Sequence, residues 1–306
     1  MGRRPDLSDL DLGTLAKELL ESDQVVLSPV QTEGIETHAY RVASNGRIAC
    51  LRISRSTRAF AKDQWAHEML GDRLPVPRIW ELGVLDNNRA FCLSEWMPGK
   101  TLQDLTPTEV KRALPAVFDA WSSIANCNLD NISGYGDFDA ETQLAPHETW
   151  QEVLQAPTLK ATSWDPTWTA PRSKQLTELL DTYNTLIADC PDKRQLVHGD
   201  WGSNNLLIAD GRVTAVLDWE NATIGDPLYD VATRFWTTWP PVTTCMTLQA
   251  AHSDTLFANQ PHYHKRARCY DLHRGLQTIE TALTTNDHTL ANWAFNRSLD
   301  LAQQTP

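Results

Sequence analysis

The stretch that decides the fold reads Leu196-Val-His-Gly-Asp-Trp-Gly-Ser-Asn-Asn-Leu-Leu-Ile208, and Val216-Leu-Asp-Trp-Glu220 follows it shortly. An apolar pair opens the first segment, and His198 and Asp200 then stand two residues apart. Asn205 follows five residues after Asp200, and the chain turns apolar again. Polar residues confined between two apolar runs are typical of a loop that joins buried strands.

A β-hairpin is predicted immediately after this loop. Asp210-Gly211 is a strong hairpin turn signal, and the β-branched run Val213–Leu217 follows it. The second strand ends at Asp218. The hairpin therefore places Asn205 and Asp218 at the same end of two paired strands, with Asp200 on the loop just before them.

The residue types at these positions indicate phosphoryl transfer. Asn205 and Asp218 offer hard oxygen ligands for Mg²⁺, which takes one or two protein ligands beside substrate phosphates. Asp200 is free to orient a hydroxyl and accept its proton. The His-x-Asp-x-x-x-x-Asn spacing follows the same logic as a protein-kinase catalytic loop, although Trp-Glu follows the metal Asp here. The alternative is a polar hairpin whose Asp and Asn side chains only stabilise turns; the number of constrained positions favours the catalytic interpretation.

Length and composition limit the number of domains, the location and the partners that the chain can have. The chain has 306 residues, a formal net charge of −12 and six scattered cysteines. This length allows one large or two smaller domains, and no apolar run approaches the ~20 residues that span a bilayer. With no visible signal peptide and no Cys-x-x-Cys pair, we expect a cytoplasmic protein with reduced thiols that does not bind a membrane. The acidic charge argues against a nucleic-acid partner and suits a cationic small-molecule substrate.

Short motifs carry a family resemblance. Four of them, His198-Gly-Asp200, Asn205, Asp218-Trp-Glu220 and Gly225-Asp-Pro-Leu-Tyr-Asp230, resemble the aminoglycoside phosphotransferase and choline-kinase-like family. A closer likeness, to its hygromycin B phosphotransferases, extends to Leu74-Pro-Val-Pro77, Gly99-Lys-Thr-Leu-Gln-Asp-Leu105, Ser133-Gly-Tyr-Gly136 and Cys190-Pro191, in the same order. Together the motifs cover nearly the whole chain, and their common order is far more specific than any single motif.

The resemblance implies an α+β, bilobal, protein-kinase-like fold that uses ATP and Mg²⁺. An N-terminal antiparallel sheet lobe, residues 1–97, would bind the nucleotide, and a larger, mainly helical lobe, residues 98–306, would hold the catalytic and acceptor sites. Pro98-Gly99 breaks the chain at the hinge between them. Periodicity predicts helices at 8–20, 58–70, 108–125, 173–189, 270–284 and 289–303, strands at 25–30, 37–42, 47–53, 78–85 and 90–96, and weak regularity across 134–171.

Nucleotide contacts follow from position and family. Arg52 alternates with apolar neighbours on the third strand, where such a fold places a Lys on the α/β-phosphates. Arg is chemically tenable there, with a solvated strand cation as the alternative. Asp63 is the preferred pairing acid, and Glu68 is the other candidate. The resemblance places loop 32–38 over the phosphates, and backbone groups of the hinge residues Ser94, Glu95, Trp96 and Met97 at the adenine edge.

Acceptor contacts are predicted mainly from charge. The candidate polar groups are Glu220, Asn204, Asp230 and Glu280, although Asp226 or Asp230 could instead brace the catalytic loop. Trp236 and Trp239 fall three apart at the far end of a helix opened by Pro227. They could stack on sugar rings, or they could belong to the core.

The leading hypothesis is an aminoglycoside O-phosphotransferase of the hygromycin B type, which confers resistance by inactivating the antibiotic, and we expect a monomer. A kinase of a macrolide, amino alcohol or sugar is the first alternative. A nucleotide-binding pseudokinase is the second; it is supported by Arg52 and opposed by the intact Asp200, Asn205 and Asp218.

Overall fold

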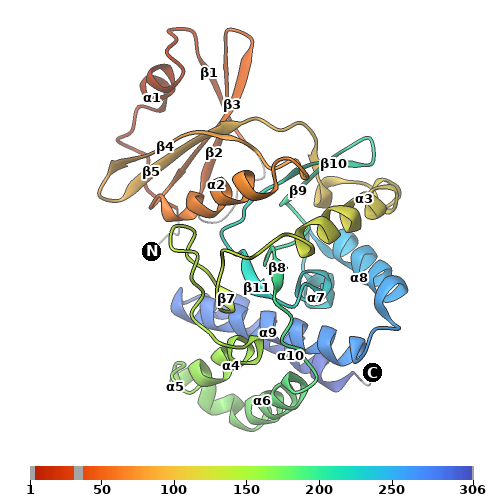
Figure 1. The fold of residues 1–306 in the computed structure, drawn as a ribbon. Helices are drawn as coiled ribbons and strands as arrows, with labels where there is room; N and C mark the ends of the chain where they lie inside the picture. The colour runs from red at the N-terminus through yellow and green to blue at the C-terminus, as the bar shows by residue number, and fades with distance from the viewer. Residues whose placement is uncertain (1–3, 31–36, 305–306) are drawn as a thin grey trace.

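The computed structural model describes residues 4–30 and 37–304, and they form a smaller and a larger lobe (Figure 1). The smaller lobe carries an antiparallel sheet of order β1-β2-β3-β5-β4. Its elements are α1 (Leu12–Leu19), β1 (Val26–Pro29), β2 (His38–Ser44), β3 (Arg47–Ser54), α2 (Arg58–Leu70), β4 (Ile79–Asp86) and β5 (Arg89–Glu95). The predicted hinge lies between β5 and β6, a strand that already pairs with the larger lobe.

Local turn chemistry fixes the register of the small sheet. Asn45 and Gly46 both adopt positive φ, at 48° and 80°, and Ser44 pairs with Arg47 across the turn. The first helix begins later than predicted, since Ser8 lies outside it. Asp11 caps the helix instead, because its carboxylate accepts hydrogen bonds from the N–H groups of Gly13 and Thr14.

The larger lobe is mainly helical (Figure 1). Its α-helices are α3 (Pro107–Ala125), α4 (Trp150–Ala161), α5 (Pro166–Thr169), α6 (Ser173–Ile187), α7 (Leu228–Val231), α8 (Thr243–Phe257), α9 (Tyr263–Thr284) and α10 (His288–Gln303). The 3₁₀ turns are η1 (Leu102–Asp104), η2 (Ala170–Arg172) and η3 (Arg234–Thr238). Two small sheets, of order β10-β9-β6 and β7-β11-β8, comprise β6 (Lys100–Thr101), β7 (Gly136–Asp137), β8 (Gln195–Val197), β9 (Leu206–Ala209), β10 (Arg212–Val216) and β11 (Thr223–Gly225).

The predicted hairpin is present as β9 and β10. Asp210 and Gly211 occupy its turn with positive φ, and Ala209 pairs with Arg212. The weakly periodic segment 134–171 contains β7, α4, α5 and part of η2, so it is more regular than its sequence indicates. The helix opened by Pro227 is short and ends at Val231, so the two tryptophans predicted on it lie on and just after η3 instead.

Helix α2 joins the two lobes by its packing. Its buried residues Trp65, Ala66 and Leu70 belong to the large hydrophobic core of the helical lobe. The core of the sheet lobe is separate and small, and it includes Val42, Leu51 and other residues of α1, β2, β3 and β5. Polar side chains that project from α2 are therefore held in a fixed position relative to the larger lobe.

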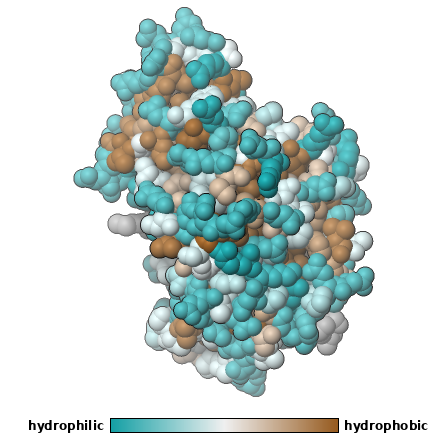
Figure 2. All heavy atoms as spheres, viewed as in Figure 1, coloured by the Kyte–Doolittle hydropathy of each residue, from teal (hydrophilic) through white to brown (hydrophobic). Residues whose placement is uncertain are grey.

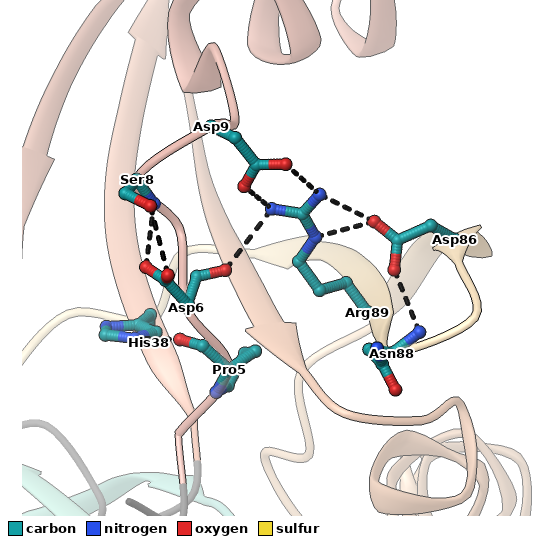
Figure 3. Close-up of polar contacts among 8 residues, drawn as sticks. All are labelled: Pro5, Asp6, Ser8, Asp9, His38, Asp86, Asn88 and Arg89. Carbon is teal, nitrogen blue, oxygen red and sulfur yellow. Dashed lines mark hydrogen bonds and ion pairs between the residues drawn. The ribbon is translucent and has the colours of Figure 1, made fainter.

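Arg89 fastens the N-terminal segment to the sheet lobe (Figure 3). Its guanidinium donates to Asp86 Oδ2 at 2.7 Å, to Asp9 Oδ2 at 3.0 Å and to the backbone oxygen of Asp6 at 3.2 Å. His38, at the start of β2, bonds the backbone oxygen of Pro5. Ion pairs with exposed carboxylates contribute little to stability, so these contacts order the segment more than they stabilise the fold.

Hydrophilic residues cover most of the face shown in Figure 2, and hydrophobic ones gather on the smaller lobe. Val26 and Val84 are among its exposed apolar side chains. Across the part of the chain that the structure describes, no helix has the length and apolar character needed to cross a membrane.

Candidate active site

His198 braces the loop between β8 and β9. Its Nε2 lies 3.0 Å from the backbone oxygen of Leu217, and the N–H of Asp200 donates to its Nδ1 at 3.3 Å. Because a carbonyl oxygen only accepts, the ring proton sits on Nε2. Burial lowers the pKa of His198, so the ring is neutral. It therefore ties the loop to the residue before Asp218 and is too enclosed to act as a base.

Asp200 and Asn205 meet at the mouth of this loop. Asp200 is exposed, whereas Asn205 is buried beneath it. The Asn205 amide nitrogen donates to the backbone oxygen of Asp200 at 2.9 Å and to its Oδ2 at 2.8 Å. Both amide hydrogens are thereby used, and Oδ1 of Asn205 is the atom left for a cation.

Asp218 completes the predicted metal set. The Leu217 N–H donates to the backbone oxygen of Asn205 at 2.8 Å, so the two predicted ligands lie on adjacent strand ends. Burial raises the pKa of Asp218 to about 7, and the carboxylates of Asp63 and Asp200 act in the same direction. A divalent cation would offset this excess of negative charge. The donor set of one carboxylate and one amide oxygen therefore fits Mg²⁺.

The predicted ion pair on the sheet lobe is present. Arg52 Nη2 lies 2.6 Å from Asp63 Oδ2, and the Arg52 guanidinium also stacks over the Phe60 ring at 4.9 Å. The other Asp63 oxygen accepts from the backbone N–H of Trp219 at 2.8 Å. Asp63 thus connects the strand arginine to the residue that follows Asp218, and Glu68 on the exposed face of α2 is not the pairing acid.

The hinge residues differ in how far burial and hydrogen bonds within the protein already occupy them. Ser94 is buried within β5 opposite Cys50. The backbone N–H of Glu95 donates to Arg78 at 2.9 Å and is therefore unavailable to an adenine. Trp96 and Met97 follow as half-buried residues, with Arg41 over the Trp96 ring at 5.8 Å. Backbone recognition of a base stays a prediction, and loop residues 31–36 lie outside the described part of the chain.

The assignment of Asp230 to the acceptor site is wrong. Its side chain is fully buried, and its two oxygens accept from the N–H groups of His198 and Gly199, each at 2.8 Å. A carboxylate enclosed in this way cannot reach a ligand. Asp230 instead braces the catalytic loop, which is the alternative that the sequence left open. Asp226 is structural too, bonded to Arg266 and Tyr270.

A cleft of about 1130 Å³ lies between α2, the β7 region, α4 and α9. Glu220 and Glu280 both line it, as does Gly199 of the catalytic loop. Glu280 pairs with Lys160 at 3.0 Å, so an acceptor ammonium would have to replace that lysine. Asn204 is half-exposed on the loop beside Asn205. Roles for Glu220, Glu280 and Asn204 in acceptor binding stay predictions.

The two predicted stacking tryptophans lie elsewhere. Trp236 stacks on Trp293 of α10, with ring centroids 5.7 Å apart, and Trp239 meets the same ring edge-on at 4.5 Å. Both are half-buried against the core of the helical lobe and neither lines the 1130 Å³ cleft. They form an aromatic cluster, and its use by an acceptor stays a prediction.

Lys62 lies next to the candidate active site, although no sequence motif pointed to it. It is buried, it lines the cleft, and it contacts the segment just after Asp218. The only local signal is a cation directly before Asp63, a pattern common on exposed helix faces. Its burial arises from the packing of α2 onto the helical lobe.

A sheet lobe with an arginine–acid pair, joined to a helical lobe with an Asp/Asn loop and a strand-end Asp, defines a kinase-like phosphotransferase. The chain belongs to the phosphotransferase enzyme family, whose sequence profile matches residues 29–268. This confirms the resemblance read from the motifs.

Three similar proteins match this chain over most of their own length. The chain is 32% identical to hygromycin-B 4-O-kinase of Escherichia coli over 295 residues, 94% of this chain and 84% of that protein. A thermostable mutant of aminoglycoside phosphotransferase APH(4)-Ia, in a ternary complex with AMP-PNP and hygromycin B, superposes with a TM-score of 0.84 at 31% identity, covering 95% and 98% of the two chains. A variant complexed with ADP and hygromycin B gives a TM-score of 0.85 at 30% identity over the same shares. The predicted α+β bilobal fold is confirmed.

Proposed function

We propose that this chain transfers the γ-phosphoryl group of ATP to a hydroxyl of an aminoglycoside of the hygromycin B type. The observation that carries the proposal is the placement of exposed Asp200 directly over Asn205, beside the strand end that bears Asp218. The likeness to hygromycin-phosphorylating relatives supports the substrate class.

Each group has a defined task in this proposal. Asp200 orients the acceptor hydroxyl and takes its proton as the hydroxyl oxygen bonds to the γ-phosphorus, while the bond from that phosphorus to the β,γ-bridging oxygen breaks and ADP leaves. Asn205 Oδ1 and Asp218 hold Mg²⁺, which neutralises charge on the phosphates when bound. Arg52, fixed by Asp63, contacts the α/β-phosphates. The intact set disfavours a pseudokinase.

The acceptor is a polycation in this proposal. Glu220 and Glu280 present carboxylates to the cleft, and the chain carries a net charge of −12. Both features favour ammonium groups over a neutral sugar. Asn204, Trp236 and Trp239 are the further candidate contacts. We also propose that the enzyme works as a cytoplasmic monomer.

The test is an ATP-consumption assay with Mg²⁺ across hygromycin B, other aminoglycosides, a macrolide and an amino alcohol. Hygromycin B should give the highest kcat/KM, and phosphorylated hygromycin should be detected by mass spectrometry. A higher kcat/KM for the macrolide or the amino alcohol would show that the enzyme acts on that class of acceptor instead. No ATP consumption with any acceptor would instead support the pseudokinase.

A further inference from the structure

We infer that Lys62 is a positioning residue that locks the segment after Asp218 against α2 and so sets the geometry of the metal site. Its Nζ donates to the backbone oxygens of Glu220 at 3.1 Å and Ala222 at 2.7 Å, and to Asp137 Oδ1 on β7. The ammonium also lies 4.8 Å from the Phe138 ring centroid. The inference rests on the proposed role of Asp218 as a metal ligand.

The hydrogen bonds of Lys62 are all directed into the protein. An ammonium has three donors, and the two carbonyl oxygens and one carboxylate oxygen provide three acceptors. The side chain is only 9% exposed although it borders the cleft. Lys62 therefore has no hydrogen left to donate to a phosphate or an acceptor. Its role is thus to hold the protein, unlike the roles proposed for Arg52 and for the carboxylates that face the cleft, which contact ligands.

Lys62 and Asp63 hold the two sides of the same short segment. Asp63 accepts from the N–H of Trp219, and Lys62 donates to the oxygens of residues 220 and 222. Adjacent residues of one helix thus satisfy an N–H group and two C=O groups that regular secondary structure leaves unpaired. Since α2 packs into the core of the helical lobe, this double anchor is rigid.

The anchor is needed because the backbone at Asp218 is strained. Asp218 has φ = +62°, in the left-handed region, which is unfavourable for a residue that carries a Cβ atom. That conformation persists only where the flanking residues are held. Without Lys62, the segment 219–222 is held only through the Trp219 N–H, and the position of the Asp218 carboxylate relative to Asn205 becomes less well defined.

The experiment compares Lys62→Met, which keeps the apolar stem, with Arg58→Met on the same helix. Arg58 also pairs with Asp137, at 3.8 Å, but its side chain is 83% exposed. Lys62→Met should raise the Mg²⁺ concentration for half-maximal ATP binding about 10-fold, the lower end of the range for loss of a residue that hydrogen-bonds a metal ligand directly, because Lys62 contacts the segment after Asp218 and not Asp218 itself. Calorimetry without acceptor measures this directly. Arg58→Met should leave that concentration unchanged.

Two further readouts separate positioning from simple destabilisation. In Lys62→Met, kcat should fall, and hydrogen exchange in 219–223 should become faster, whereas Arg58→Met should change neither. If Lys62→Met does not fold, Lys62→Arg provides the test, because a planar guanidinium cannot direct hydrogens at the same three oxygens; it should show the same rise, smaller in size.

An unchanged Mg²⁺ requirement in the folded Lys62 variant would overturn the inference, as would a rise confined to the acceptor KM. Asp218→Asn, measured in parallel, separates this failure from failure of the proposed function. If Asp218→Asn weakens Mg²⁺-dependent ATP binding and Lys62→Met does not, only the role of Lys62 is wrong. If neither variant changes it, Asp218 is not a metal ligand and the inference fails with that assignment.

Discussion

The Nε2 of His198 donates to the backbone oxygen of Leu217 across 3.0 Å, and this bond joins the catalytic loop to the strand that ends at Asp218. The Asp200 N–H bonds the other ring nitrogen. One buried imidazole therefore connects the backbone of the proposed base to the strand that carries the proposed metal ligand. The arrangement explains why a histidine that cannot reach the substrate stands two residues before Asp200.

Replacing Asp200 by Asn tests the proposed base. The amide keeps an oxygen that can accept from Asn205 but cannot take a proton, so kcat should fall by about 10²–10⁴. Calorimetry should give a nucleotide Kd near that of the wild type, because Asp200 lies on the acceptor side. Asp210→Asn, in the exposed hairpin turn, is the matched control. Wild-type turnover by Asp200→Asn would exclude Asp200 as the base.

Gly199→Ala should be much more harmful than Gly46→Ala. Gly199 has φ = +84°, and a Cβ there would overlap the backbone oxygen of Asn221. Gly46→Ala is the matched control, since its φ is +80° and a Cβ would meet open space. The control should lose about 1 kcal/mol of unfolding free energy, measured by urea denaturation. Gly199→Ala should lose more unfolding free energy than the control and should also lower kcat. Equal losses in the two variants would show that the backbone at 199 and 221 can move apart without destabilising the protein.

Where short-range rules act, the sequence predicted the structure well. Asn45-Gly46 and Asp210-Gly211 require positive φ, and both turns form at the predicted residues. Helix α2 has its predicted bounds, Arg58–Leu70. Asn205 and Asp218 share one hairpin, so their proximity follows from a two-residue turn. The Arg52–Asp63 pair needed the family resemblance as well, because periodicity alone does not choose between Asp63 and Glu68.

Contacts between distant segments were not predictable. Asp230 faces the loop because the tertiary fold brings α7 against His198 and Gly199, and nothing near residue 230 encodes that direction. Trp236 and Trp239 are held by Trp293, more than fifty residues later, so their spacing alone says little. Lys62 looks like a surface cation until α2 is seen to pack into the helical lobe. Tertiary packing decided each of these cases.

Asp271 gives the stability of this protein a predictable pH dependence. Its side chain is fully buried, Oδ1 accepts from the Phe235 N–H at 2.8 Å, and Oδ2 has no hydrogen-bond partner among the described residues. Burial raises the pKa of Asp271 from 3.8 to about 6. The folded state therefore holds the proton more tightly than the unfolded state, and the contribution of this group to stability is lost as pH rises from about 4 through about 6.

Asp271→Asn should remove the loss of stability with rising pH, while its amide oxygen can still accept the hydrogen bond from the Phe235 N–H. Its unfolding free energy relative to the wild type should increase between pH 4 and pH 7, by roughly 3 kcal/mol at most. Urea denaturation at several pH values measures the difference between the two proteins, in which other titrating groups cancel. A difference that stays constant across this range would mean that Asp271 is already ionised in the folded protein at pH 4.

The last prediction concerns the cationic acceptor. Glu220 is half-buried at the cleft and follows Asp218 by two residues, so its carboxylate is placed to meet an ammonium near the reacting hydroxyl. Partly exposed charges are screened over a Debye length of ~10 Å at 0.1 M salt. The KM for hygromycin B should therefore rise with ionic strength while kcat changes little, and Glu220→Gln should flatten that rise. Glu81→Gln, on the exposed side of β4, should retain the wild-type salt response. If KM does not depend on salt in the wild-type enzyme, the acceptor is recognised without its charges, and a neutral sugar or a monocationic amino alcohol becomes the better substrate class.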